Sequence, residues 1–457
     1  MANTYITRTP SSNGNQKTWT WSGWIRPRGM SSSTYQYLME AYYSNGTRYS
    51  YVCFRHGTIE CYGGDYQTGS STSLSFDVTT NRRLRDTSAW YHVVVAFDST
   101  QATNTNRVKI YINGVQETSF QGYVGGGSLT WPDQNDDTFF NITTTLNRIG
   151  KEFDGCMAHV HFVDGTAYAA STFGETDSTS GIWVPKLNPT VTYGTNGFFL
   201  KFANSGNMDL DSSSNNLTFA TTGTLTQTND TPSNSFMVFN PLDNVPYINT
   251  TFSNANTTIA TGSSYTGTNC NMWLTQGKWY WEIKCVSKTG DNDHYSIGID
   301  GADPANGTNQ YPAAASKSWM IDGHSGNVYN NNSGTAYGAA FGAGDIIGIA
   351  LDLTNSKLYF SKNGTWQNSG VPTSGSTGTG AVSITAAAST DIRSYIPCAT
   401  FWSGSSGTFS LNSGAGFFGT TAVASANADA NGNGAMEYAV PSGYYTLCTK
   451  NIKEFGI

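Results

Sequence analysis

The chain has 457 residues and a formal net charge of −7, and 12% of its residues are charged while 13% are aromatic. A typical soluble protein has about 25% charged residues, disordered chains lack aromatic side chains, and coiled coils need repeated Glu, Lys, Leu and Ala. The composition therefore excludes disorder and helical bundles. With no Lys/Arg cluster larger than residues 82–85, it also excludes a nucleic-acid binder, and we expect a large all-β protein.

Predicted strands begin early in the chain and include one tight hairpin. Residues 19–25 alternate aromatic and other residues, which predicts a strand. Residues 91–97 form an almost continuous apolar strand that ends at Asp98. Residues 108–112 alternate apolar and polar side chains and lead into Asn113-Gly114, a pair that tolerates positive φ at both turn positions and so predicts a hairpin.

The same order of elements recurs far downstream. Residues 346–351 predict an apolar strand that ends at Asp352, and residues 357–362 predict a second strand before Asn363-Gly364. This recurrence predicts two domains built on related sandwich topology rather than a short-period repeat.

The boundaries of these domains are predicted from composition. Residues 240–246 contain two prolines and look like a junction, while the Ala/Asn/Gly-rich residues 422–434 resemble a linker. We therefore predict an all-β fold of two antiparallel β-sandwich (jelly-roll type) domains with long loops. The predicted parts are a first sandwich over 1–240, a second over 241–418 and a docking tail over 419–457.

The sequence shows no signal for a membrane. The first nine residues lack the basic and apolar regions of a signal peptide, and no apolar run approaches the roughly 18 residues of a membrane-spanning helix. We expect no membrane insertion.

Two family resemblances follow from these motifs. Residues 19–25, 90–98, 109–115 and 149–165 together resemble a laminin-G-like, concanavalin A-like sandwich. Further along, a second set of segments resembles a SPRY domain: residues 277–284, 295–299, 344–352, 358–364 and 395–399.

The combination of both domains with the tail motif at 441–449 resembles proteins of tailed bacteriophages. That resemblance implies a virion component, either a fibre or a surface decoration, assembled in the host cytoplasm and located at the virion surface.

Catalytic patterns are absent from the sequence. Retaining glycoside hydrolases of the concanavalin A-like fold carry paired carboxylates on one strand face, and hydrolysis needs two of them at a defined separation. Only Glu152/Asp154 and Glu175/Asp177 show this spacing for a glutamate, and neither belongs to a run of three. We therefore predict no catalytic residues and no enzymatic activity.

Metal binding stays open at this stage. His159 and His161 have a spacing that places both rings on one strand face, although two half-exposed strand histidines are the favoured explanation. Three acidic loops could supply oxygen ligands for calcium, and solvated turns are the alternative. These loops are residues 133–137, 209–211 and 291–293. No cofactor is predicted, with calcium as the one open possibility.

Aromatic platforms are the binding chemistry that the chain favours. Sugars stack their apolar faces on Trp and Tyr, while Asn, Asp and Gln bond their hydroxyls. Packing in a core or in a subunit interface is the alternative for each aromatic. The predicted glycan-binding residues are Trp131, Asp133, Asp136, Asp137, Tyr311, Trp319 and Trp402.

These observations predict a non-enzymatic phage virion protein, a fibre or surface-attached adhesin that binds host glycans. The alternative is a capsid decoration protein that binds neighbouring virion subunits, and a third reading is a glycan hydrolase. The expected partners are other virion proteins, host cell-surface carbohydrate and further copies of this chain in a homo-oligomer.

Overall fold

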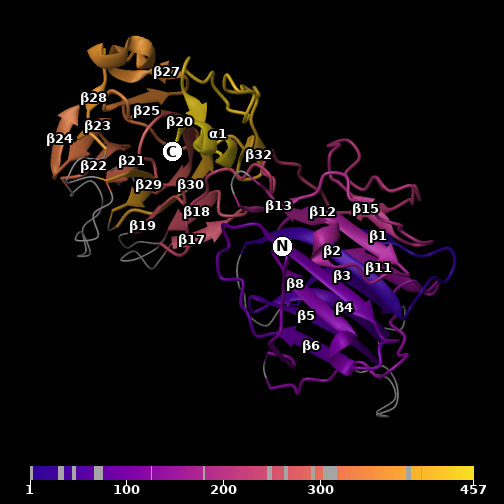
Figure 1. The fold of residues 1–457 in the computed structure, drawn as a ribbon. Coiled ribbons are helices and arrows are strands. Elements are labelled where there is room, and N and C mark those ends of the chain that lie inside the picture. The colour runs from indigo at the N-terminus through magenta and orange to yellow at the C-terminus, as the bar shows by residue number, and fades with distance from the viewer. Residues whose placement is uncertain are drawn as a thin grey trace. The chain divides into compact units, whose positions relative to one another are not determined.

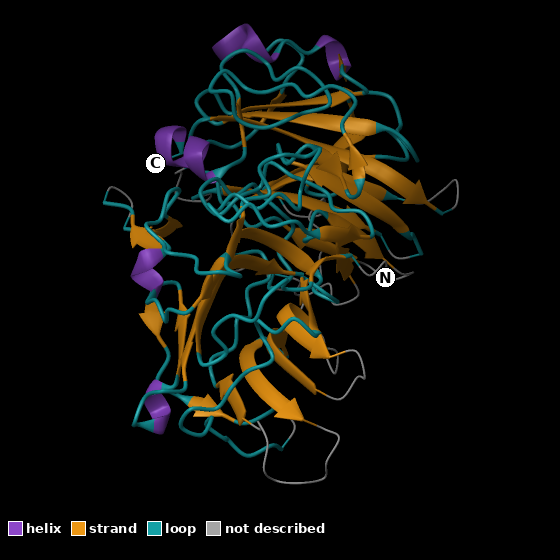
Figure 2. Cartoon of the chain, turned by 90° about the vertical axis from the view of Figure 1, so that its right-hand side faces the viewer, coloured by secondary structure: helices purple, strands orange, loops and turns teal. Residues whose placement is uncertain are grey.

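The computed structural model divides into two compact units, Met1–Gln227 and Thr228–Ile457, and strands dominate both of them (Figures 1 and 2). The predicted all-β fold of antiparallel sandwiches is confirmed. No helix in the described part is long and apolar enough to cross a membrane. The structure describes residues 4–28, 35–43, 48–65, 76–124, 126–178, 181–243, 250–261, 266–289, 294–301, 316–387, 393–402 and 404–456.

The first unit is a sandwich of two antiparallel sheets. The larger sheet contains, in spatial order, β10 (Phe120–Gln121), β6 (Phe76–Thr80), β5 (Thr58–Asp65), β4 (Arg48–Arg55), β3 (Gln36–Tyr43), β11 (Thr145–Ile149), β1 (Tyr5–Arg8) and β16 (Ala220–Thr222). The smaller sheet contains β15 (Phe198–Leu200), β12 (Gly155–Asp164), β2 (Thr18–Pro27), β7 (Tyr91–Asp98), β8 (Val108–Ile112) and β9 (Val115–Gln116).

Alternation along the strands builds the core between these sheets. Trp19 and Trp21 of β2 are fully buried there, and the Trp19 ring stacks on Phe97 of β7 at 5.1 Å between centroids. The segment after β12 folds back over the outer face of the smaller sheet and forms a second apolar layer with Val94 and Phe199. That segment includes η2 (Ala170–Thr172) and the hairpin of β13 (Gly174–Thr176) and β14 (Trp183–Pro185).

The second unit is also a sandwich. Its larger sheet contains β17 (Thr250–Ser253), β18 (Thr258–Thr261), β30 (Gly407–Asn412), β20 (Lys278–Lys288), β25 (Ile346–Asp352), β26 (Lys357–Lys362) and β27 (Thr365–Trp366), with β28 (Val382–Ser383) beside β26 and β33 (Tyr445–Thr446) parallel to β20. Its smaller sheet contains β19 (Thr266–Asn269), β29 (Tyr395–Phe401), β21 (Tyr295–Gly301), β22 (Ser318–Asp322), β23 (Asn327–Asn330) and β24 (Ser333–Ala336). The remaining short elements are η1 (Asn104–Asn106), η4 (Gln367–Ser369), η5 (Pro372–Thr377), the hairpin of β31 (Phe417–Phe418) and β32 (Thr421–Ala422), and α1 (Thr449–Phe455).

Both predicted Asn-Gly hairpins form, and each contains the same type of local hydrogen bond to the asparagine side chain. Asn113 and Gly114 have φ of 49° and 82°, and Asn363 and Gly364 have φ of 48° and 79°. In the first unit the backbone N–H of His92 donates to Asn113 Oδ1 at 2.8 Å. The matching bond in the second unit, from the N–H of Ile346 to Asn363 Oδ1, is 2.9 Å long.

The boundary between the units differs from the predicted one. The chain divides between residues 227 and 228 rather than between 240 and 241. Residues 236–239 are buried in the second unit, where the N–H of Met237 donates to the carbonyl of Leu447 at 2.9 Å. Their apolar run is too short to show from sequence alone which core it joins.

The segment predicted as a docking tail is part of the second sandwich. Tyr444, Leu447 and Met436 are buried in that unit, and β33 extends its larger sheet. The low-complexity residues 422–434 do not behave as a free linker, because the buried carboxylate of Asp429 accepts backbone hydrogen bonds from Asn431 and Asn433 at 3.0 Å each.

Candidate functional site

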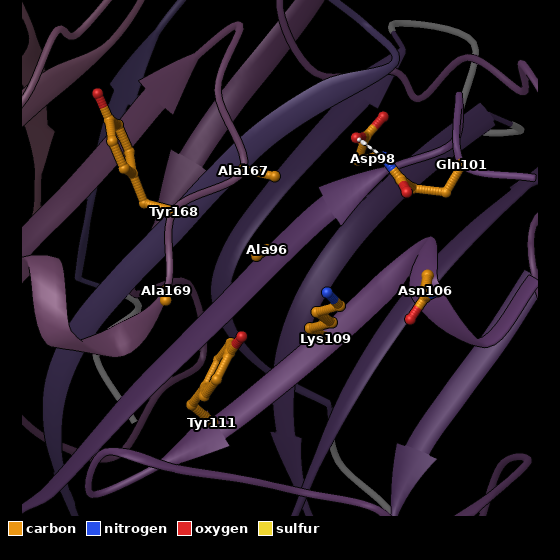
Figure 3. Close-up of a pocket in the computed structure, with 9 residues that line it drawn as sticks. All are labelled: Ala96, Asp98, Gln101, Asn106, Lys109, Tyr111, Ala167, Tyr168 and Ala169. Atoms are coloured by element: carbon orange, nitrogen blue, oxygen red, sulfur yellow. Dashed lines mark hydrogen bonds between the residues drawn. The ribbon is translucent and has the colours of Figure 1, made fainter. Parts of the chain in front are cut away.

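A pocket of about 230 Å³ opens on the outer face of the smaller sheet of the first unit (Figure 3). The period-two alternation of β7 and β8 directs Val95 and Ile110 into the core and leaves their neighbours on the opposite face. The loop after β7 and the loop after β12 supply the walls. The lining residues are Ala96, Asp98, Gln101, Asn106, Lys109, Tyr111, Ala167, Tyr168 and Ala169.

One carboxylate and one ammonium group line this pocket. Asp98 accepts hydrogen bonds from Thr100 Oγ1 and Gln101 Nε2, both at 2.6 Å. Burial raises the pKa of Asp98, but these bonds outweigh burial, so the pKa lies below its usual value and the group stays ionised. Lys109 extends from the floor of the pocket beside Tyr111 (Figure 3).

The predicted loop around Trp131 supports the pocket indirectly. The Trp131 ring is half-buried against the core and meets Phe120 edge-on at 5.4 Å. Asp136 Oδ2 accepts the N–H of Asp133 at 2.8 Å, and Ser99 Oγ donates to the Asp136 carbonyl at 2.6 Å. The loop therefore braces the chain next to Asp98, while Trp131, Asp133, Asp136 and Asp137 are not among the lining residues.

The predicted residues of the second unit do not form one site. Trp319 is 7% exposed and packs in the core against Tyr395, so its prediction as a sugar platform is wrong: the strand alternation turns it inward. Trp402 is half-buried, stacks on His294 at 4.5 Å and meets Tyr329 edge-on at 6.1 Å. Tyr311 lies outside the described residues.

The histidine pair is engaged by aromatic neighbours. A register shift in β12 lies between Ala158 and His161. His161 stacks on Phe199 at 3.8 Å, and its Nδ1 is 2.9 Å from the hydroxyl of Tyr193. His159 also contacts Phe199, at 5.8 Å. Across the described ranges, no three His, Cys, Asp or Glu side chains gather as metal ligands would.

Two of the three acidic loops can be assessed for calcium, because residues 291–293 lie outside the described residues. The loop at 133–137 uses Asp136 for the internal bond given above. In the loop at 209–211, Asp211 is buried and accepts hydrogen bonds from the N–H groups of Phe199 and Leu217, at 2.9 and 2.8 Å, and from Ser213. The oxygens of Asp211 therefore serve as a structural anchor.

Replacing Asp211 by alanine should lower the free energy of unfolding by about 3 kcal/mol, because it leaves buried N–H donors without acceptors. Urea unfolding in EDTA and in millimolar calcium checks this, and we expect the same loss in both. Asp209→Ala is the matched control with a small effect, since Asp209 accepts a bond from the exposed Thr221. If calcium instead stabilises the wild type against urea and does not stabilise Asp211→Ala, the loop is a metal site.

A buried Ser–His contact was not found from sequence. Trp183 Nε1 donates to His92 Nδ1 at 3.0 Å, which leaves the ring proton on Nε2, 2.9 Å from Ser22 Oγ. His92 therefore donates to Ser22 and cannot act as its general base. The three residues come from separate strands, so no local motif in the sequence marks them.

Comparison with known proteins identifies both folds. Residues 1–171 match the concanavalin A-like lectin/glucanases superfamily, and residues 278–394 match the SPRY domain. The chain is 30% identical over 89 residues to the Ran-binding proteins 9/10 homolog of Drosophila melanogaster, which covers 19% of this chain and 9% of the relative. It is 34% identical over 89 residues to Ran-binding protein 9 of Homo sapiens, covering 19% and 12%.

Among solved structures, the SPRY domain of human HERC1 is 20% identical, with 34% of this chain and 87% of that chain covered and a TM-score of 0.27. The TRIM65 PSpry domain is 15% identical, with 38% and 89% covered and a TM-score of 0.27.

These matches concern domains and not a whole protein. The chain spans only 9% and 12% of the length of these two curated relatives. The two family models support the two folds, whereas the bacteriophage setting rests on sequence resemblance and stays a prediction. The chain carries a concanavalin A-like, laminin-G-like domain in its first unit and a SPRY domain in its second.

Proposed function

We propose that this chain is a non-catalytic binding protein whose first domain holds one unit of a host-surface glycan in the pocket beside Asp98 and Lys109. In the setting that the sequence resemblance suggests, it acts at the surface of a phage particle as a fibre component or adhesin. The observation that carries the proposal is the pocket itself, where charged, amide and phenol groups converge on one small hollow.

The chemistry of the lining supports a sugar. Tyr111 and Tyr168 supply aromatic rings, and Gln101, Asn106 and Asp98 supply donors and acceptors for hydroxyl groups. Pockets for drug-sized ligands measure roughly 300–1,000 Å³, so a hollow of about 230 Å³ suits a single sugar unit.

Binding is favoured over hydrolysis by the number of acidic groups. Glycoside hydrolysis uses two carboxylic groups on opposite sides of the scissile bond. Asp98 is the one carboxylate among the lining residues, and it is held by hydrogen bonds that favour its ionised form. It could not serve as the general acid.

Lys109→Met and Tyr168→Ala should each weaken glycan binding about tenfold, because each removes one polar or aromatic contact from the pocket. A glycan array identifies the sugar, and calorimetric titration of that sugar measures the change. Lys357→Met is the matched control, since Lys357 lies in the other unit and bonds to Ser383. An array on which the wild type binds no glycan would reject the proposal.

The second candidate is attachment to a neighbouring virion protein, and an exposed apolar pair favours it. Ile182 and Leu187 flank β14 and are 61% and 62% exposed. Exposed apolar side chains mark a contact surface where they form one contiguous patch, and these two stand on either side of the same short strand. The measurement is incorporation of Ile182→Asp into particles. A lower incorporation with unchanged glycan binding would support this candidate.

A further inference from the structure

Strands β3, β4 and β5 are neighbours in the larger sheet of the first unit (Figure 1), and tyrosine side chains cover much of their outer face. Val52, Phe54 and Ile59 of β4 and β5 face the core, so alternate residues point outward. In this outer layer Glu40 pairs across the strands with Tyr51, and Tyr51 pairs with Tyr62. We call the surface the tyrosine face; it consists of Tyr35, Tyr37, Tyr42, Tyr49, Tyr51, Tyr62 and Tyr123 around Arg55.

The tyrosine rings pack mainly on one another. The Tyr51 ring stacks on Tyr62 at 4.9 Å and meets Tyr37 edge-on at 5.4 Å, while Tyr35 stacks on Tyr37 at 5.9 Å. Tyr51 is buried at the centre and the tyrosines around it are half-buried. Mutual stacking uses the faces of the rings, so a ligand on this surface meets ring edges and phenol oxygens.

Arg55 lies within this surface with donors that lack acceptors. Its guanidinium carbon is 4.0 Å from the ring centre of Tyr35 and 4.2 Å from that of Tyr123, and its Nη2 donates to the Tyr123 hydroxyl at 3.0 Å. Arg55 is 4% exposed, and in the described part of the chain its Nε and Nη1 have no hydrogen-bond partner. Arginine cannot lose its charge, so these donors are open to an acceptor that the described residues do not supply.

Two carboxyl groups, those of Glu60 and Asp77, lie near Arg55, and each accepts a hydrogen bond from a tyrosine of this surface, Tyr51 and Tyr123 respectively. Arg148 is bound to Glu40, with 2.6 Å between Nε and Oε1, and Lys151 lies 3.8 Å from the same oxygen. Glu60 accepts a hydrogen bond from Tyr51 at 2.7 Å, and burial raises the pKa of Glu60 to about 7. Below neutral pH the carboxyl group of Glu60 is mostly protonated, so it repels an incoming anion little.

We propose that the tyrosine face is a second ligand site, on a different sheet from the pocket, and that it binds an acidic saccharide. The sugar carboxylate pairs with Nε and Nη1 of Arg55 in the two-pronged geometry that guanidinium favours, and the phenol groups bond the sugar hydroxyls. Tyr35 precedes β3, and its half-buried ring lies against the guanidinium group, 4.0 Å from the guanidinium carbon.

A protein partner fits this surface less well. The centres of protein interfaces are rich in apolar area, whereas the outward residues of β4 and β5 here are tyrosine, arginine, glutamate and cysteine. The strongly exposed aliphatic residues of the described first unit lie outside the tyrosine face: Val115, Leu129, Ile182, Leu187 and Leu210.

The test uses oligomers of galacturonate, of mannuronate and of hyaluronan, each paired with its methyl ester, which keeps the sugar backbone and removes the charge. We expect the full chain to bind at least one acidic oligomer about tenfold more tightly than its ester in calorimetric titration. Arg55→Met should lose at least tenfold in affinity for that oligomer. Lys151→Met removes a cation that already lies close to Glu40, and it should change the affinity for the acidic oligomer less than threefold.

Other outcomes overturn the proposal or separate it from the pocket. Equal affinity for acid and ester, no binding of any acidic oligomer, or full binding by a folded Arg55→Met chain would each reject it. Tighter binding of a poly-glutamate peptide than of every oligomer would assign the face to a protein partner. Lys109→Met should leave the acidic oligomer unaffected, so failure of the pocket and failure of this site are distinguishable. Far-ultraviolet circular dichroism confirms that each variant folds.

Discussion

A chain that ends at residue 419 should lose the folded second unit and not merely a docking tail. The missing segment includes Met436, Tyr444, Leu447 and Cys448, all of which are buried at 1% exposure or less. Removing a large buried apolar side chain costs about 2–5 kcal/mol, and a domain has only about 5–15 kcal/mol of stability in total. Loss of several at once exceeds what the sandwich can tolerate.

A buried carboxylate makes the same deletion more costly. Glu282 in β20 accepts the backbone N–H groups of Glu437 and Tyr438, both at 2.8 Å, and a bond from Asn412 at 3.3 Å. Without residues 437 and 438 the Glu282 carboxylate loses two of the hydrogen bonds that compensate its burial in the full chain. Glu282→Ala in the full chain removes the acceptor and should cost about 2 kcal/mol, since the partly buried N–H groups of Glu437 and Tyr438 then lack their partner.

Limited proteolysis and scanning calorimetry of the truncated chain measure this effect. We expect rapid cleavage within residues 228–419 and loss of the transition that belongs to the second unit. Lys450→Ala is the control at an exposed position of α1 and should change the unfolding free energy by less than about 0.5 kcal/mol. If the truncated chain keeps both transitions and full protease resistance, the segment is a separate tail after all.

Acid should destabilise the first unit through its buried histidines. Burial lowers the pKa of His92 to about 3 and that of His159 to about 4, and it lowers the pKa of His161 strongly. A histidine whose folded pKa lies below its unfolded value of about 6.5 stabilises the fold above that pH. This stability is lost as the pH falls from about 6.5 towards 3, at up to about 1.4 kcal/mol per pH unit for each group.

Urea unfolding between pH 7 and pH 4 tests this prediction by comparing variants. Glu60 acts in the opposite direction, because its raised pKa of about 7 adds stability at low pH that is lost as the pH rises. The unfolding free energy is plotted against pH for the wild type and for His161→Gln, and the difference between the two slopes isolates the contribution of His161. The free energy of the wild type should fall more steeply as the pH falls. His324→Gln, an exposed position in the second unit, is the control. Equal slopes for the wild type and His161→Gln would contradict the prediction.

Much of the fold could be predicted from local patterns. The strands at 19–25, 91–97 and 346–351 and both Asn-Gly hairpins form because side-chain alternation and turn chemistry act within a few residues. The two families could be identified for the same reason, since their motifs are short strand segments. Neither signal depends on which strands become neighbours in space.

The residues of the binding surfaces could not be predicted from the sequence, because they meet only when particular strands become neighbours in space. The pocket joins β7, β8 and the loop at 167–169, and none of its residues was predicted. The tyrosine face had a signal in the alternating Tyr35/Tyr37 and Tyr49/Tyr51 pairs, but only strand pairing places them around Arg55. Trp319 and Trp402 were predicted alike, yet one faces the core and the other stacks on His294.

The sequence by itself determined that this chain forms antiparallel β-sandwiches, because strand alternation and Asn-Gly turns are local properties, and its strand motifs resemble those of two families. The tertiary structure alone decided the unit boundary, the place of the last forty residues and the side chains that meet at each surface. The physical reason is that burial and polar pairing join residues that are not neighbours in sequence. Glu282 pairs with the backbone of Glu437, 155 positions away. Asp429, in the low-complexity segment, pairs with Thr446.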